Sequence, residues 1–183
     1  MKVLLDACVL YPTVMREMLI GAAAAGLYEP LWSARILEEW ARAAAKLGPG
    51  QEALARGEVA ALQARWPGAS VKPHAGDEAR LWLPDPADVH VLAAAIAGSA
   101  DMIVTLNAKD FPRHTLDEEG VTRESPDLFL RDLYDAAPEA LISVGRAVKA
   151  EAERLSGEPW PIRKLMKKAR LPRLGKALDA AGV

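Results

Sequence analysis

The stretch from residue 83 to residue 111 constrains the fold of this chain more than any other. It begins with a turn rich in Pro and Asp, continues through an Ala-rich segment at 88–97, and then gives the short apolar run 102–106. The Ala-rich segment predicts a helix, and an apolar run of this length after it is typical of a strand buried in a parallel sheet. Thr105, Asn107 and Asp110 close the run. The stretch therefore predicts a helix and a central strand whose carboxyl end carries polar side chains.

Strand and helix patterns alternate over the first 133 residues. Strands are expected at 2–5, 28–32, 71–73, 102–106 and near Val121, and helices at 14–26, 33–40, 52–64, 88–97 and 126–133. This alternation predicts a three-layer α/β fold with a mostly parallel central sheet. Right-handed crossovers would bring the carboxyl ends of the strands to one edge, where ligands bind in open α/β sheets.

The character of the chain changes at Ala137. We expect one domain over residues 1–136 and a helical C-terminal extension over 137–183, which begins with an Ala-rich amphipathic helix at 138–155. The net charge of the whole chain is only −2, so a general polyanion binder is not indicated. The end of the chain is nevertheless strongly basic, with a single acid after residue 160 (Asp179) against Arg163, Lys164, Lys167, Lys168, Arg170, Arg173 and Lys176.

Cysteine content and hydropathy exclude other classes of protein. Cys8 is the only cysteine, which excludes an internal disulfide and a Cys-rich zinc site and favours a reducing cytoplasm. No apolar run approaches the ~20 residues that span a bilayer, so no membrane segment is expected. Cys8 is expected to be a small core residue, and Trp32, Trp40, Trp66 and Trp82 are expected to be core or packing residues. His74 and His90 are expected to be structural or surface residues rather than ligands.

Four carboxylates from separate segments are placed to meet at the same edge of the sheet. Asp6 follows the first strand, Asp110 follows the strand at 102–106, Glu39 lies on the helix after Ser33, and Asp88 begins the Ala-rich helix. Clustered carboxylates repel unless a cation or protons neutralise them, and oxygen ligands suit Mg²⁺ or Mn²⁺. One or two such ions can activate water for cleavage of a phosphodiester.

Each of these carboxylates also has a simpler interpretation. An Asp at the start of a helix often caps it, which applies to Asp88 and more strongly to Asp85. One of Glu38 and Glu39 is expected to be a solvated charge on its helix, and Asp110 could be a turn residue. The four together, in this order and at these strand ends, favour a shared pocket.

The four segments also resemble the successive motifs of the PIN domain family. They read DACVL at 6–10, SARILEEW at 33–40, DPADVHVLAA at 85–94 and VTLNAKDF at 104–111. The resemblance covers roughly residues 1–133. It implies a Mg²⁺- or Mn²⁺-dependent ribonuclease that cleaves RNA by metal-activated water, most often the toxin of a VapBC-type toxin–antitoxin pair. The end of the chain resembles the helical extension of one bacterial branch of the family.

Site residues and partners follow from the resemblance by motif position. Asp6, Glu39, Asp88 and Asp110 would be the acidic catalytic and metal-binding quartet. Thr105 and Asn107 match polar supporting positions, and Asp85 is the second candidate acid of the third motif. Cys8 stands where many members carry Ser, Thr or Asn, and Asn107 where some carry Asp. The implied partners are an RNA substrate, a small antitoxin protein and a second copy of the chain, for which the Ala-rich helices offer small-residue faces.

Several alternatives stay open at this point. A haloacid-dehalogenase-type phosphatase normally carries a second acid where this chain has Cys8. A receiver domain needs an acidic pair at the end of its first strand, where this chain has Asp6 without an adjacent acid. Both classes are therefore disfavoured. A catalytically silent RNA- or protein-binding module with the same fold is the main alternative. The basic end of the chain could bind RNA phosphates through a helical stripe of Arg163, Lys167 and Arg170 flanked by Lys164 and Lys168, dock an acidic antitoxin segment, or be a solvated face.

Overall fold

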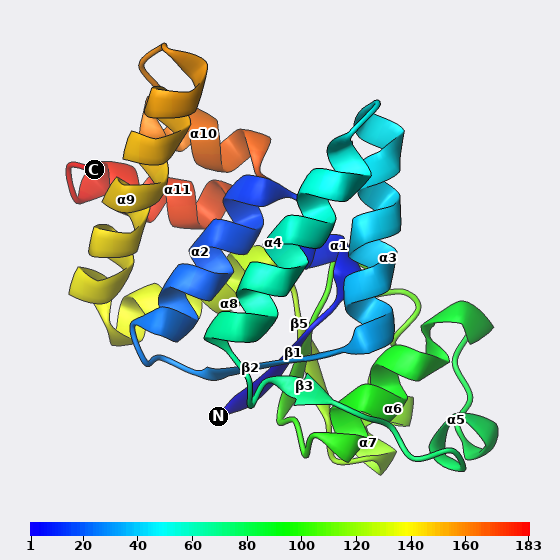
Figure 1. Cartoon of the computed structure of the whole chain (residues 1–183). Coiled ribbons are helices and arrows are strands. Elements are labelled where there is room, and N and C mark those ends of the chain that lie inside the picture. Colours follow the sequence, from blue (N-terminus) through cyan, green and yellow to red (C-terminus); the bar gives the residue numbers. More distant parts are fainter. The chain divides into compact units, whose positions relative to one another are not determined.

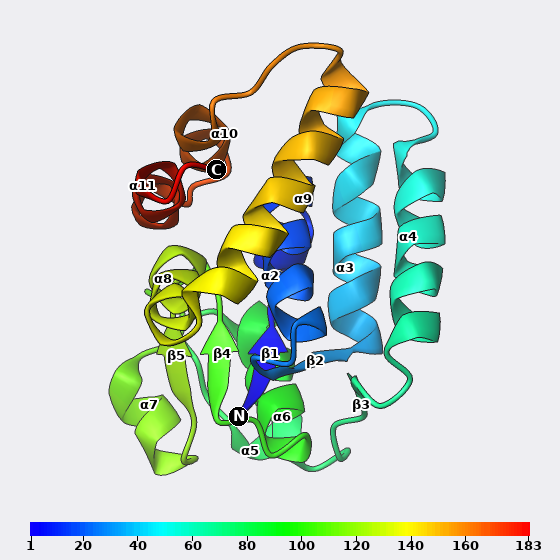
Figure 2. The ribbon, with the colours of Figure 1, turned by 90° about the vertical axis from the view of Figure 1, so that its left-hand side faces the viewer.

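The computed structural model describes residues 1–183 and contains a five-stranded parallel sheet (Figure 1). The strand order is β3-β2-β1-β4-β5 (Figure 2), and every neighbouring pair runs parallel. The strands are β1 (Lys2–Leu5), β2 (Glu29–Ser33), β3 (Ser70–Val71), β4 (Met102–Val104) and β5 (Thr122–Glu124). The α/β class is confirmed, and the sheet is entirely rather than mostly parallel.

The order of the strands reverses between β1 and β4. The chain adds β2 and β3 on one side of β1 and then returns to add β4 and β5 on the other side. Leu5 at the end of β1 pairs with Val104 at the end of β4, so both carboxyl ends meet at one edge. Such a reversal is the place where open α/β sheets bind ligands. Residues that directly follow β1 and β4 are therefore the first candidates for a site.

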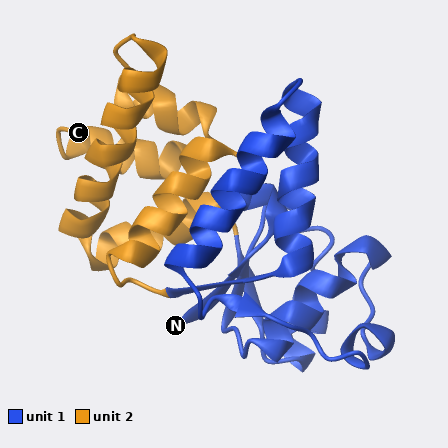
Figure 3. Cartoon of the chain, viewed as in Figure 1, with its two compact units in different colours: residues 1–11, 29–124 blue, residues 12–28, 125–183 orange.

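The structure divides into two compact units that interleave along the sequence (Figure 3). The first unit comprises residues 1–11 and 29–124 and holds the sheet. Its helices are α1 (Ala7–Leu10), α3 (Ala34–Ala44), α4 (Gln51–Arg65), α5 (Asp77–Arg80), α6 (Val89–Ala97) and α7 (Arg113–Glu118), with short 3₁₀ turns at Ala45–Leu47 and Pro86–Asp88.

Sequence patterns account for these helices. The Ser33 side chain accepts a hydrogen bond from the Ile36 N–H and so caps α3, as expected from its position.

Helix α3 packs against α4, and α6 packs against β1, β2 and β4. Ala93–Ala95 on α6 are fully buried, so these small residues serve close packing within the unit. The proposed use of the Ala faces for association of two chains is wrong for this helix.

The second unit is helical and comprises residues 12–28 and 125–183. Its helices are α2 (Thr13–Ala24), α8 (Pro126–Ala136), α9 (Pro138–Ser156), α10 (Ile162–Lys168) and α11 (Pro172–Ala180). A Cβ atom on Gly21 would lie 2.5 Å from a Val144 methyl, so glycine permits the close approach of α2 and α9. The division of the chain into a domain at 1–136 and a C-terminal extension at 137–183 stays a prediction.

The basic end of the chain forms two short helices instead of one stripe. Helix α10 ends at Lys168, and Arg170 has a φ of +61°, in the left-handed region. The prediction that Arg163, Lys167 and Arg170 share one helical stripe is therefore wrong at Arg170. None of the helices has the length and apolar character needed to cross a membrane.

Candidate functional site

Asp6 is the fixed centre of the polar group at the β1–β4 edge. It directly follows β1, and its backbone N–H donates to the Val104 carbonyl at the end of β4. The side chain is only 5% exposed, and its Oδ2 accepts a hydrogen bond of 2.6 Å from the Thr105 hydroxyl. Thr105 Oγ1 in turn accepts from the Asn107 N–H at 2.9 Å. This chain of hydrogen bonds holds the Asp6 carboxylate in one orientation.

Cys8 belongs to the same network, which the sequence did not indicate. Its Sγ donates to Asp6 Oδ2 at 3.0 Å and accepts from the Leu106 N–H at 3.2 Å. Burial and the adjacent Asp6 carboxylate raise the pKa of Cys8 to about 12, so it stays a thiol and a donor. The expectation of a plain core residue is therefore wrong: Cys8 supplies a donor where a hydroxyl is common in the family motif that DACVL resembles.

Asp88 is the acid of this site whose side chain lacks a hydrogen-bond partner at a buried oxygen. It is half-buried at the start of α6, and its Oδ2 is buried without a hydrogen-bond partner. Burial, followed by the negative charges of Asp6, Asp85 and Asp110, raises the pKa of Asp88 to about 6. Buried polar atoms are otherwise almost always paired. The structure thus brings Asp88 under the influence of three other carboxylates, Asp6, Asp85 and Asp110.

The neighbouring acids have more ordinary local contacts. Asp85 Oδ1 accepts a hydrogen bond from the Ala87 N–H at 2.9 Å, so the capping interpretation is confirmed for Asp85. Asp88 makes no such capping bond. Asp110 follows a turn in which its N–H donates to the Asn107 carbonyl, and its side chain is 13% exposed, 4.0 Å from Lys109 Nζ.

Glu39 lies close to two side chains, those of His90 and Arg35. Its Oε1 lies 3.0 Å from Nε2 of the buried His90 and 3.3 Å from Arg35 Nε. The His90 contact is close in distance but lacks good hydrogen-bond geometry, and Nδ1 of His90 has no partner. Burial raises the pKa of Glu39, but His90 and Arg35 together lower it by more. The structure places Glu39 beside His90, and Glu39 is absent from the main charges that act on Asp88.

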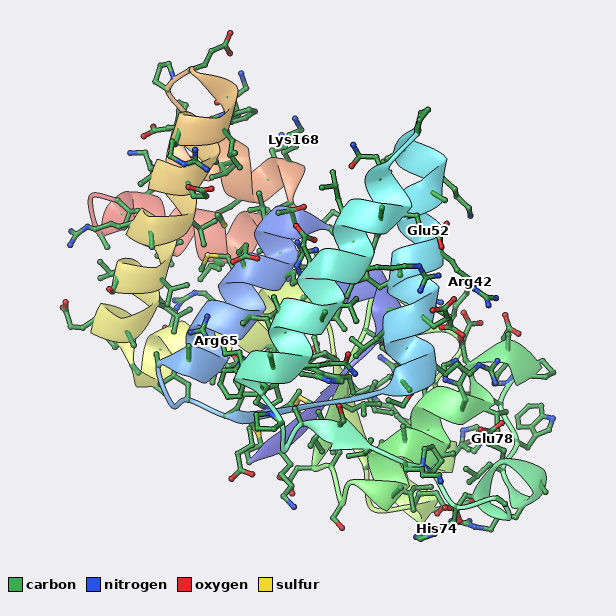
Figure 4. All side chains as sticks on the ribbon, viewed as in Figure 1. Arg42, Glu52, Arg65, His74, Glu78 and Lys168 are labelled. Carbon is green, nitrogen blue, oxygen red and sulfur yellow. The ribbon has the colours of Figure 1, made fainter.

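Glu38 faces a separate network between α3 and α4. It pairs with Arg42 on its own helix and with Arg56 on α4, which also pairs with Glu52. Figure 4 shows Arg42 and Glu52 on these two helices. These cations hold the pKa of the Glu38 carboxyl well below its usual range. Glu38 is therefore the helix-surface acid of the Glu38–Glu39 pair, as expected for one of them.

The chemistry of the donor set decides whether a divalent cation fits this edge. No group of three or more His, Cys, Asp or Glu side chains is arranged so that it could hold a metal ion as the side chains stand. The unpaired buried oxygen of Asp88 and the mutual influence of Asp6, Asp85, Asp88 and Asp110 nevertheless call for a positive charge among them. All of these atoms are carboxylate oxygens, which Mg²⁺ and Mn²⁺ prefer. The chemistry of these residues fits such an ion, although their side chains would have to move to bind it.

The remaining aromatic and basic residues divide between the two units. Trp32 and Trp40 are buried as expected, but Trp82 is 66% exposed, so its predicted packing role is wrong. The next residue along the chain, Leu83, is buried instead. The basic residues predicted to form the RNA-binding stripe and its flanks are all exposed, namely Arg163, Lys164, Lys167, Lys168 and Arg170.

Comparisons with known proteins agree with the geometry. A family described as "PIN domain" matches residues 2–109, which is more than half of the chain. A protein of Mycobacterium tuberculosis named "Putative ribonuclease VapC50" is 45% identical over 58 residues. That alignment covers 30% of this chain and 34% of the relative, so the chain spans about a third of its length. No solved structure matches.

Proposed function

Because this chain belongs to the PIN domain family, we propose that it is a Mg²⁺- or Mn²⁺-dependent endoribonuclease that hydrolyses RNA phosphodiesters with an activated water molecule. The relative with which it shares 45% identity over 58 residues is named a ribonuclease, which supports the substrate class. The observation that carries the proposal is the buried, unpaired Asp88 Oδ2 among three further carboxylates at the point where the strand order reverses.

Asp6, Asp88 and Asp110 would hold the cation, with Glu39 as the fourth acid of the quartet. A bound divalent ion supplies charge that neutralises phosphate oxygens and lowers the pKa of water. Thr105 and Cys8 orient Asp6 by donating to its Oδ2, which leaves Oδ1 available for a ligand. Supporting groups of this kind fix a ligand's orientation and tune its affinity. Asn107 acts through its backbone N–H, which orients the Thr105 hydroxyl.

Glu39 acts in this proposal together with His90. The two groups lie 3.0 Å apart, and the guanidinium of Arg35 is also close to the same carboxylate. The lowered pKa of Glu39 keeps it ionised, so it can attract a cation or accept a hydrogen bond from water. To reach a cation shared with Asp88, Glu39 would have to exchange its contact with His90 for one with the ion.

The biological setting is part of the proposal and rests on the family and the named relative. We propose that the chain is the toxin of a toxin–antitoxin pair, with RNA as substrate, a small antitoxin protein as inhibitor and a homodimer as its assembly. A cytoplasmic location is proposed because Cys8 is the single cysteine, which suits a reducing compartment.

A cleavage assay separates this proposal from a catalytically silent PIN-fold binding module. Purified protein is incubated with a labelled single-stranded RNA under three conditions: with Mg²⁺, with Mn²⁺, and with excess EDTA. The proposal predicts cleavage with either ion and none in EDTA, with activity restored when the ion is added back. RNA binding without cleavage under every condition would favour the silent module, and cleavage undiminished by EDTA would contradict the metal requirement.

A further inference from the structure

The helical unit contains a groove that the proposed nuclease chemistry does not use. It has a volume of about 520 Å³ and is bounded by the start of α2, the end of α9 and helix α10. Most of its lining is apolar, including Val14, Leu155, Trp160 and Leu165. Leu155 is 67% exposed, although a leucine of a helical unit normally packs inside. The groove is therefore an exposed apolar surface of the size that ligands and side chains occupy.

Two lysines of α10 lie beside Trp160, a residue that lines this groove. Lys164 and Lys168 on α10 place their ammonium groups 5.7 and 5.0 Å from the centre of the Trp160 ring. Neither lysine forms a salt bridge, and the two acids at the end of α9 have other partners: Glu151 pairs with Arg154, and Glu153 accepts from the Trp160 N–H. Lys168 also lines the groove and extends from α10 (Figure 4).

The Trp160 side chain is fixed rather than loose. Its indole Nε1–H donates to Ser156 Oγ at 3.0 Å, and its backbone N–H donates to Glu153 Oε1 at 2.9 Å. A rigid aromatic wall beside an apolar floor, with lysines at the rim, matches a ligand that has an apolar anchor and negative charge next to it.

We propose that this groove docks an acidic amphipathic segment of a partner protein, with an apolar side chain seated on Leu155 and Trp160 and carboxylates paired with Lys164 and Lys168. A second copy of the chain fits poorly, since helix α10 beside the groove carries four cations and no acid, and a symmetric contact would bring like charges together. RNA fits less well than a peptide because the floor is apolar and the Trp160 ring is already engaged by two ammonium groups.

The test uses the full chain and a fluorescein-labelled helical peptide of about four turns, with leucines on one face and Glu or Asp elsewhere. A matched peptide carries Lys at every acidic position, and a labelled single-stranded RNA is the third probe. Affinity is measured by fluorescence anisotropy at low and high salt for the wild type, Leu155→Asp, Lys168→Glu and the control Lys176→Glu. Lys176 lies on α11, outside the groove, and its reversal makes the same change in net charge as that of Lys168.

The acidic peptide should bind the wild type at least about tenfold more tightly than the basic peptide, a difference of about 1.4 kcal/mol. Leu155→Asp and Lys168→Glu should each weaken it by about tenfold or more, whereas Lys176→Glu should leave it nearly unchanged. Leu155 and Lys168 are exposed, and circular dichroism confirms that each variant is folded. The proposal would be overturned if both peptides bound with equal affinity. It would also be overturned if neither Leu155→Asp nor Lys168→Glu weakened binding of the acidic peptide. RNA binding that both variants weaken, or self-association that Leu155→Asp abolishes, would overturn it as well.

Discussion

A single hydroxyl group, that of Thr105, links the end of β4 to the Asp6 carboxylate. Thr105→Val keeps the shape of the side chain but removes the donor that holds Asp6 Oδ2 at 2.6 Å. We expect the variant to lose about 10- to 100-fold in Mn²⁺ affinity or in cleavage rate, the usual effect of removing a group that orients a metal ligand. Isothermal titration with Mn²⁺ and a cleavage assay measure this, with Thr105→Ser as the control that restores the donor. Wild-type values for Thr105→Val would contradict the orienting role.

The raised pKa of Asp88 makes the free energy of unfolding depend on pH, and the direction of the shift gives the sign of that dependence. The pKa of Asp88 in the folded chain is about 6, above its ordinary value of 3.8. Between these two pH values the folded state binds more protons than the unfolded state, so the free energy of unfolding falls as pH rises through this window. Asp88→Asn removes the effect. Above the window and in EDTA, we expect it to be more stable than wild type by about 1 kcal/mol once solvent screening is allowed for.

Thermal unfolding followed by circular dichroism measures this difference. For a chain of this size, about 1 kcal/mol corresponds to about 2–4 °C in Tm. Below the window both proteins should have the same Tm, because Asp88 is then protonated in both the folded and the unfolded state. A lower Tm for Asp88→Asn above the window would show that Asp88 makes stabilising contacts as a carboxylate, and it would rule out an uncompensated charge at this position.

Residues differ in how far the sequence alone predicted them. Asp6 and Asp88 could be placed because a strand end and a helix start fix where their Cβ atoms lie. Glu39 also lies on the expected helix, but its partner is a matter of side-chain conformation, and its contact with His90 has no signature in the sequence. The thiol of Cys8 donates to Asp6, two residues before it, and accepts from the Leu106 N–H, which only the fold brings next to it.

Among the elements, α3 depends on its cap. Ser33→Ala removes the acceptor of the Ile36 N–H bond and should lower the free energy of unfolding by about 1 kcal/mol. Urea denaturation measures the loss, and Ser33→Thr, which keeps a hydroxyl acceptor, should retain most of the stability. If Ser33→Ala and Ser33→Thr were equally stable, the cap would contribute nothing.

The strands and the longer helices were predicted, and the shortest helices were not. The five strands and helices α2, α3, α4, α6, α8 and α9 match expected segments within a few residues. Helices α1, α5 and α7 have only four to six residues, too few for a periodic pattern to stand out. The break at Arg170 was not predicted, because the sequence does not indicate that an Arg will adopt a left-handed backbone conformation.

At the scale of the whole molecule, assembly stays a prediction of the family resemblance. The Ala runs that suggested flat association faces are partly buried within the units, as Ala93–Ala95 show. Sedimentation equilibrium at tens of micromolar should nevertheless give a mass of twice the 19.7 kDa chain. A mass of one chain across that range would argue against the homodimer without affecting the proposed chemistry.

In the proposed mechanism, the acids at the β1–β4 edge cleave RNA with the help of a divalent cation. Asp6→Asn tests this most directly, because Asn keeps the size of the side chain and can still contact Thr105 and Cys8 while it removes the charge. The control is Asp117→Asn, the same change at an exposed position on α7. RNA cleavage in saturating Mn²⁺ should be abolished in Asp6→Asn and unchanged in Asp117→Asn, with the same circular dichroism for both. Undiminished cleavage by a folded Asp6→Asn protein would contradict the assignment of this site.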